Sequence, residues 1–178
     1  MKKLTILTLL LLSMTTMMSN VAIVTSLPHL KEYFIHVNDI EFYSRLMLTL
    51  PSLIIALLAP ILGHIIFQFG KKKSTLFSLC LFSISGSAGL YLESIELLLF
   101  SRAIFGISIA SLMIVTTSLV GDYFKENERH KFMGYQSAFM AIGGVFFVIG
   151  GGFLSDISWR LPFAIYLIGA LLLPLVFK

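Results

Sequence analysis

The stretch GHIIFQFGKKK, Gly63–Lys73, decides the fold class of this sequence, because three lysines directly follow a long uncharged run. A soluble domain carries about 25% charged residues. This chain of 178 residues is 12% charged and 57% hydrophobic, with a mean hydropathy of +0.94. We therefore expect a membrane protein whose lysines lie at the membrane surface, where anionic headgroups attract them.

Six apolar stretches lie along the chain, before and after this point. A helix needs about 20 mostly apolar residues to cross a bilayer, and six stretches meet or nearly meet that length. Because a backbone inside lipid must satisfy its own hydrogen bonds, we expect each to be a helix of one bundle covering residues 1–178. The expected spans are 4–26, 46–70, 74–92, 97–121, 132–154 and 161–177.

The lysines and arginines outside the spans are distributed unevenly between the two sides. With the N-terminus in the cytoplasm, nine lie inside and three outside. The positive-inside rule therefore predicts that both termini are cytoplasmic. A secretory signal peptide is the alternative for the first span, since Lys2 and Lys3 precede it. Its apolar run continues to about Ser26 without a clear cleavage site, which favours a retained helix.

Other function classes find little support in the residues. The basic residues border apolar spans and form no face with interleaved aromatic residues, which argues against nucleic-acid binding. There is no H-E-x-x-H motif and no P-loop, and we expect neither enzymatic activity nor a cofactor. Of the four histidines only His64 falls inside a span, without an obvious nucleophile. Cys80 is the single cysteine, so no disulfide framework or metal cluster is expected.

Arg102 is the most informative residue, since a charge inside a membrane helix is costly and by default indicates function. It lies roughly 8 Å into the fourth span at 1.5 Å per residue. Snorkelling of its side chain to the outer headgroups is the structural alternative. Gly106, Ala110 and Met113 follow on the same helical face, and the first two allow close helix contact. We therefore expect Arg102 to face protein or a water-filled cavity.

Two further features concern the path that a substrate would take. The fifth span is rich in glycine, which is compatible both with tight helix packing and with a bendable helix beside a gate. The first span carries a polar patch at mid-depth, for which interhelical hydrogen bonding and lining of a substrate path both stay open. The candidate path residues are Thr16, Ser19, Asn20, Met113 and Gln136.

These local patterns together resemble the major facilitator superfamily. The loop after the second helix in that family has the pattern G-x-x-x-D-R-x-G-R-K/R and acts as a cytoplasmic latch. Here Phe67 and Gln68 stand where the family has Asp and Arg, and Asp122 resembles the acidic partner of the basic loop, able to pair with Lys71 or Lys72. The matching positions are Gly63, Gly70, Lys71 and Lys72.

Two other motifs strengthen the resemblance to drug:proton antiporters of that family. Arg102 followed by Gly106 looks like the fourth-helix motif, whose arginine is associated with proton coupling. The fifth span resembles G-x8-G-x3-G-P-x2-G-G, with Phe147 and Val148 in place of the central Gly-Pro. In SNVAIVTSLPHL, Ser19 stands where such antiporters often have an acid. The matching glycines are Gly134, Gly143, Gly151 and Gly152.

The resemblance implies a proton-coupled exporter of drugs or other hydrophobic solutes, with protons, substrate and the lipid bilayer as partners. The family has two six-helix halves, each a 3+3 inverted repeat, and binds substrate between them. This chain resembles the first half, so we expect a second half as partner. Three readings stay open: a truncated product, a split-gene fragment, or a half that pairs with another chain. A non-transporting truncated fragment or partner membrane subunit is the alternative function.

Overall fold

The computed structural model describes residues 3–177, and nearly all of them are helical. Three of the expected spans form single long helices, and three are divided by short 3-10 segments. The long helices are α3 (Ile40–Phe69), α5 (Ile95–Tyr123) and α6 (Glu126–Ile157). The divided segments are α1 (Lys3–Met17), η1 (Met18–Asn20) and α2 (Val21–Tyr33); α4 (Lys71–Gly86) and η2 (Ser87–Leu90); and η3 (Leu161–Leu167) and α7 (Ile168–Phe177).

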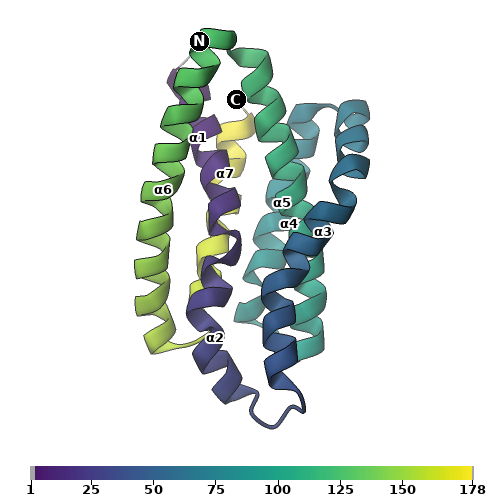
Figure 1. Cartoon of the computed structure of the whole chain (residues 1–178), viewed down its shortest axis with the longest axis vertical. Coiled ribbons are helices and arrows are strands. Elements are labelled where there is room, and N and C mark those ends of the chain that lie inside the picture. Colours follow the sequence, from purple (N-terminus) through teal and green to yellow (C-terminus); the bar gives the residue numbers. More distant parts are fainter. Residues whose placement is uncertain (1–2, 178) are drawn as a thin grey trace.

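The helices run up and down along one long axis, as Figure 1 shows, and α1 begins at the same end of the bundle at which α7 ends. We call this end, which also holds the α3–α4 and α5–α6 connections, the terminal end. The connections α2–α3 and α6–η3 lie at the opposite end. The first turn of α1 and the last turn of α7 therefore lie at the same end of the bundle.

Helix α5 is the centre of the bundle and packs against α1, α3 and α4. In its most apolar window 56% of the residues are buried, against 11% in the corresponding windows of α3 and α6. Close approach explains the contact with α3: a Cβ added at Gly106 would lie 2.9 Å from the carbonyl oxygen of Pro51. Residues 3–177 leave the apolar outer faces of α3 and α6 uncovered.

Four segments of the described residues are long and apolar enough to cross a membrane: 3–33, 40–69, 95–123 and 126–157. Residues 161–176 form a shorter apolar helix. Six crossings with the expected boundaries therefore stay a prediction. The first segment continues to Tyr33, past Pro28, so its helix is longer than the expected span.

The connection at Gly70 explains why α3 and α4 turn so tightly. Gly70 has φ 87°, a conformation that residues with a side chain rarely adopt, and it lies between the last residue of α3 and the first of α4. Its N–H donates to the carbonyl of Ile66, and its own carbonyl accepts from Ser74. One residue thus reverses the chain and brings the lysines to the start of α4.

Candidate transport path and interhelical clamp

The first candidate feature is the break in the first membrane segment. The chain leaves α1 at Met17, passes through the 3-10 turn η1 and enters α2 at Val21. Such a turn in mid-helix often marks a functional hinge, because it frees backbone groups from the regular ladder. Tyr166 uses one of them: its hydroxyl donates to the Ser19 carbonyl at 2.8 Å.

Arg102 lies close to a second break, where α4 gives way to η2. Its side chain is only 1% exposed, so it does not snorkel to the surface. Its Nη2 donates to the carbonyls of Ser85 at 3.0 Å and Gly86 at 2.9 Å, the last two residues of α4. These carbonyls lie at the end of α4, where the α-helix gives way to the 3-10 turn η2. The expectation that Arg102 faces protein is confirmed.

Besides the two carbonyls, three aromatic rings lie close to the guanidinium of Arg102. Its Cζ lies 4.6 Å from the ring centroid of Phe105, 5.3 Å from Phe163 and 5.6 Å from Tyr166. Such cation–π contacts stabilise a cation by about 2 kcal/mol or more each when water is excluded. No carboxylate forms an ion pair with Arg102 among the residues 3–177, so carbonyls and rings stabilise its charge.

Tyr166 connects the two breaks, because its ring contacts Arg102 while its hydroxyl bonds Ser19. We call Arg102 and Tyr166 together the clamp. It joins η1 and the end of α4, from the first half of the chain, to α5 and η3, from the second half. Sequence reasoning missed Tyr166, which is 0% exposed inside an apolar run, where only a polar hydroxyl hints at a partner.

Two glycines allow the clamp to pack. A Cβ added at Gly86 would lie 2.6 Å from the Tyr166 Cβ, and one at Gly89 would overlap the Phe163 ring. Gly86 is the last residue of α4, Gly89 lies in η2, and both are buried. Their positions show that the clamp depends on close backbone approach of η2 to η3.

The candidate path residues are not gathered around the clamp. Asn20, at the η1 break, is exposed, and so is Met113 on α5. Thr16 and Ser19 are half-buried, and the Thr16 hydroxyl donates to the Ser13 carbonyl at 2.7 Å. Their arrangement around one substrate path stays a prediction.

Gln136 makes a contact that the sequence left open. It lies on α6, is half-buried, and donates to the Ser13 hydroxyl of α1 at 2.8 Å. That bond joins α6 to α1 at Ser13, ahead of the η1 break. Interhelical bonding thus accounts for one of the five candidates.

The basic loop at the terminal end forms the expected ion pair. Lys71 Nζ pairs with a carboxylate oxygen of Asp122 and also donates to the Ser118 carbonyl at 3.4 Å. The pair joins α4 to the last turn of α5. Gly63 is the first glycine of the loop pattern. An added Cβ there has nothing within 4 Å, so Gly63 makes no close helix contact within the part of the chain that the structure describes.

The glycines of α6 divide into two groups. A Cβ at Gly143 would lie 2.5 Å from Met14, and one at Gly151 would lie 3.1 Å from the Thr25 hydroxyl, so these two allow close packing on α1 and α2. At Gly134 and Gly152 an added Cβ meets nothing within 4 Å. Tight packing inside this chain explains the first pair only.

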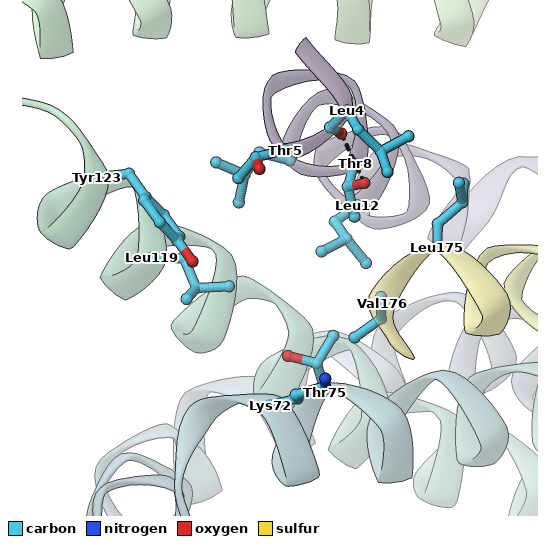
Figure 2. A pocket seen from close by; sticks show the side chains of 11 residues that line it. Leu4, Thr5, Thr8, Leu12, Lys72, Thr75, Leu119, Tyr123, Leu175 and Val176 are labelled. Atoms are coloured by element: carbon cyan, nitrogen blue, oxygen red, sulfur yellow. Dashed lines mark hydrogen bonds between the residues drawn. The ribbon is translucent and has the colours of Figure 1, made fainter. Parts of the chain in front are cut away.

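A cavity of about 560 Å³ opens at the terminal end between α1, α4, α5 and α7 (Figure 2). Lys72, whose charge marked the basic loop in the sequence, lines it together with Thr75 from the same helix. No pattern in the sequence indicates this cavity, because its walls come from four separate helices.

The fold and these sites define an all-α, multi-pass membrane protein. The family model of the Major Facilitator Superfamily matches residues 9–178, and the chain belongs to that family. The family assignment based on the local motifs is therefore confirmed.

Three relatives indicate which branch of the family is similar. Multidrug resistance protein 1 of Bacillus subtilis (strain 168) is 36% identical over 110 residues, covering 60% of this chain and 28% of that protein. Multidrug resistance protein 2 of the same strain is 35% identical over 108 residues, covering 59% and 26%. Quinolone resistance protein NorA of Staphylococcus aureus (strain N315) is 33% identical over 118 residues, covering 65% and 29%. The alignments span less than a third of each relative's length.

Proposed function

We propose that this chain forms one six-helix half of a proton-coupled efflux transporter for hydrophobic small molecules. Family membership and the names of the relatives support a role in drug resistance. The observation that carries the proposal is the clamp, which fixes a buried charge beside breaks in two membrane segments. Broken helices in transporters typically form binding sites, since their freed backbone groups bind ions and substrates.

In this proposal Arg102 acts through position and field rather than by direct proton transfer. Its guanidinium bonds the end of α4, and Tyr166 carries the contact to the η1 break beside Asn20. A proton or cation arriving near Asn20 would feel the fixed positive charge in a region of low dielectric. Arg102 thereby biases a nearby proton site, and Ser19, Asn20 and Met113 contact the substrate.

The second half of the carrier would cover the outer faces of α3 and α6. These faces carry large exposed apolar side chains, among them Leu57, Phe146 and Phe153, at 62%, 73% and 70% exposure. Lipid covers part of such a surface, and a second six-helix unit from another chain or from further sequence covers the rest. In this arrangement the Lys71–Asp122 pair holds the basic loop as a latch against the partner half.

The orientation proposed is that of the positive-inside rule, with the terminal end in the cytoplasm of a bacterial cell. The lysines of α4 and the basic residues at the start of α6 lie at that end. For a test, Lys72→Cys in a Cys80→Ser background is treated with a membrane-impermeant maleimide. Labelling is expected in inverted vesicles and not in intact cells, and Lys31→Cys should show the reverse. Labelling of Lys72→Cys from outside intact cells contradicts the orientation.

Transport itself is tested with the full chain in vesicles, using ethidium as a hydrophobic cationic probe. We expect ethidium movement to require a proton gradient. Tyr166→Phe should slow this movement, because the bond to the Ser19 carbonyl is lost. Gradient-dependent movement is absent if the chain is a non-transporting membrane subunit. Equal movement with and without the gradient in wild type and Arg102→Ala refutes the coupling role.

A further inference from the structure

A histidine joins α2 to α6 near the end of the bundle opposite the terminal end. His29 lies in the last two turns of α2, past the expected first span, and Ser155 lies in the last turn of α6. The Nδ1 of His29 lies 3.2 Å from the Oγ of Ser155. Ser155 is buried and His29 is half-buried. Nothing in the proposed transport role uses this pair.

The Ser155 hydroxyl decides which ring nitrogen of His29 carries a hydrogen. A hydroxyl has a single hydrogen, and Ser155 donates it to the Thr25 carbonyl at 2.8 Å. The Ser155 oxygen is therefore the acceptor toward His29, so Nδ1 carries the hydrogen of the neutral ring. The lone pair then lies on Nε2, which is where a further proton binds.

The Nε2 of His29 is able to take up that proton. It has no hydrogen-bond partner among residues 3–177, and it is not one of their fully buried unpaired polar atoms. A hydronium ion gives its proton to Nε2 and leaves as water, and the ring becomes a cation that donates through both nitrogens. Because charge-assisted hydrogen bonds are about twice as strong as neutral ones, proton binding strengthens the bond from Nδ1 to Ser155.

The pair attaches the part of the first membrane segment that lies beyond the η1 break. Ser19 in η1 and His29 in α2 are separated by about 15 Å along the helix at 1.5 Å per residue. Tyr166 binds the segment at the first point, and Ser155 binds it at the second. A movement of α2 away from α6 about the break therefore breaks a bond whose strength depends on a proton.

Charged groups on the elements around α2 are engaged with other partners. The elements that pack against α2 are α3, α6, η1 and η3. On α3, Glu41 forms ion pairs with Lys31 of α2, at 3.1 Å, and with Arg45. Arg160, which precedes η3, pairs with Glu93 at 3.6 Å. These ion pairs leave the histidine to its bond with α6.

Two carboxylates and a tyrosine lie closer to the pair in sequence. Glu32 is one turn after His29 on α2, and Asp156 follows Ser155 on α6. Both carboxylates are exposed, and neither forms an ion pair within residues 3–177. The ring of Tyr33 packs against other aromatic rings. Within the described part of the chain, Ser155 is thus the group that responds when the histidine gains a proton.

We propose that His29 is a proton-binding residue of this chain, and that a proton on its Nε2 strengthens the bond to Ser155 and so holds α2 against α6. In the proposed orientation this end of the bundle faces the outside of the cell, so the external proton concentration sets the state of the pair. The inference deepens the proposed transport function, on which the role of His29 in the carrier rests. Proton binding itself is measured without transport.

Nitrogen-15 NMR of the histidine rings tests the proton site in the full chain in detergent micelles. The chain has four histidines, and His29→Gln identifies the signals of His29 by their loss. We expect a hydrogen on Nδ1 alone at about pH 9 and on both nitrogens at about pH 5, because histidine exchanges this proton between about pH 5 and 8. Ser155→Ala should abolish the preference for Nδ1, since the acceptor is lost.

Three outcomes of this measurement overturn the proposal. The first is a hydrogen on Nε2 alone at about pH 9, the second is a ring that gains no proton by about pH 5, and the third is an unchanged preference for Nδ1 in Ser155→Ala. Fluorescence of Trp159 during heating confirms that each variant folds.

Ethidium movement in vesicles tests the role of His29 in the carrier. The pH on both sides is changed together, so that the proton gradient stays constant. The wild-type rate should depend on pH between about 5 and 8, and His29→Gln should lose that dependence. The matched control is His36→Gln, which replaces an exposed histidine outside the pair and should keep the dependence.

Loss of the pH dependence in both variants, or in neither, overturns the role of His29 in the carrier. Absence of ethidium movement in wild type refutes the proposed transport function instead. The NMR measurement then still decides whether His29 binds the proton.

Discussion

Replacing Arg102 with methionine tests whether the clamp stabilises the bundle. Methionine keeps an unbranched apolar stem like that of arginine but removes the charge and both bonds, to Ser85 and Gly86. Charge-assisted hydrogen bonds contribute about 1.5–3 kcal/mol each, so the lower end gives about 3 kcal/mol for two. Loss of the ring contacts adds about 2 kcal/mol or more, because water is excluded from this site.

A second effect opposes this loss, because removing a buried charge also removes its desolvation penalty. In Arg102→Met, however, the two carbonyls at the end of α4 lose their partner while still surrounded by apolar rings, which costs energy again. We expect a net loss of about 2 kcal/mol. For a chain of 178 residues that corresponds to a fall in Tm of about 4–8 °C.

The assay follows the fluorescence of Trp159, the single tryptophan, during heating in detergent. Trp159 is 7% exposed and its ring lies 6.2 Å from that of Phe163, so it reports on the region next to the clamp. Arg45→Met is the control, because that side chain is 80% exposed, and its Tm should match wild type. Arg102→Met melting at or above the wild-type temperature refutes the stabilising role.

Two further substitutions test packing and the ion pair. Gly106→Ala places a Cβ 2.9 Å from the Pro51 carbonyl oxygen and should destabilise the chain by about 1–3 kcal/mol. Gly144→Ala is the control, because its Cβ meets nothing within 4 Å, and its Tm should be unchanged or slightly higher. Similar melting of both variants argues against the close contact. Asp122→Asn removes the partner of Lys71, and because both side chains are partly exposed it should cost less than about 1 kcal/mol in the same melting assay. A fall in Tm as large as that of Arg102→Met contradicts a surface pair.

The sequence predicts the helices well because hydropathy alone determines where a chain can enter lipid. It predicts the breaks poorly, since nothing in MSN at 18–20 or SAGL at 87–90 prohibits a regular helix. Those breaks depend on partners from distant parts of the chain. Tyr166 stabilises the first and Arg102 the second, and neither pairing leaves a local signal.

The same distinction applies to the candidate site. The Lys71–Asp122 pair was predictable because unlike charges lie at helix ends that a short loop brings to one surface. The burial of Arg102 was predictable from the small residues beside it. The partners of Arg102 were not predictable, because backbone carbonyls and ring faces carry no formal charge and leave no recognisable pattern in a sequence.

The absence of an acidic residue from the expected spans limits how Arg102 can act. In many proteins a buried arginine is paired with a carboxylate, and protonation of that carboxylate then changes the pair. Here carbonyl dipoles and ring quadrupoles replace the carboxylate, and neither gains nor loses a proton as pH changes. The positive charge is therefore constant, and a carboxylate that exchanges protons must lie outside the expected spans, at a loop, on a partner half or on the substrate. In a carrier of this kind, Arg102 sets the electrostatic potential at the helix breaks, and a nearby proton-exchanging group on the partner half or on the substrate responds to it.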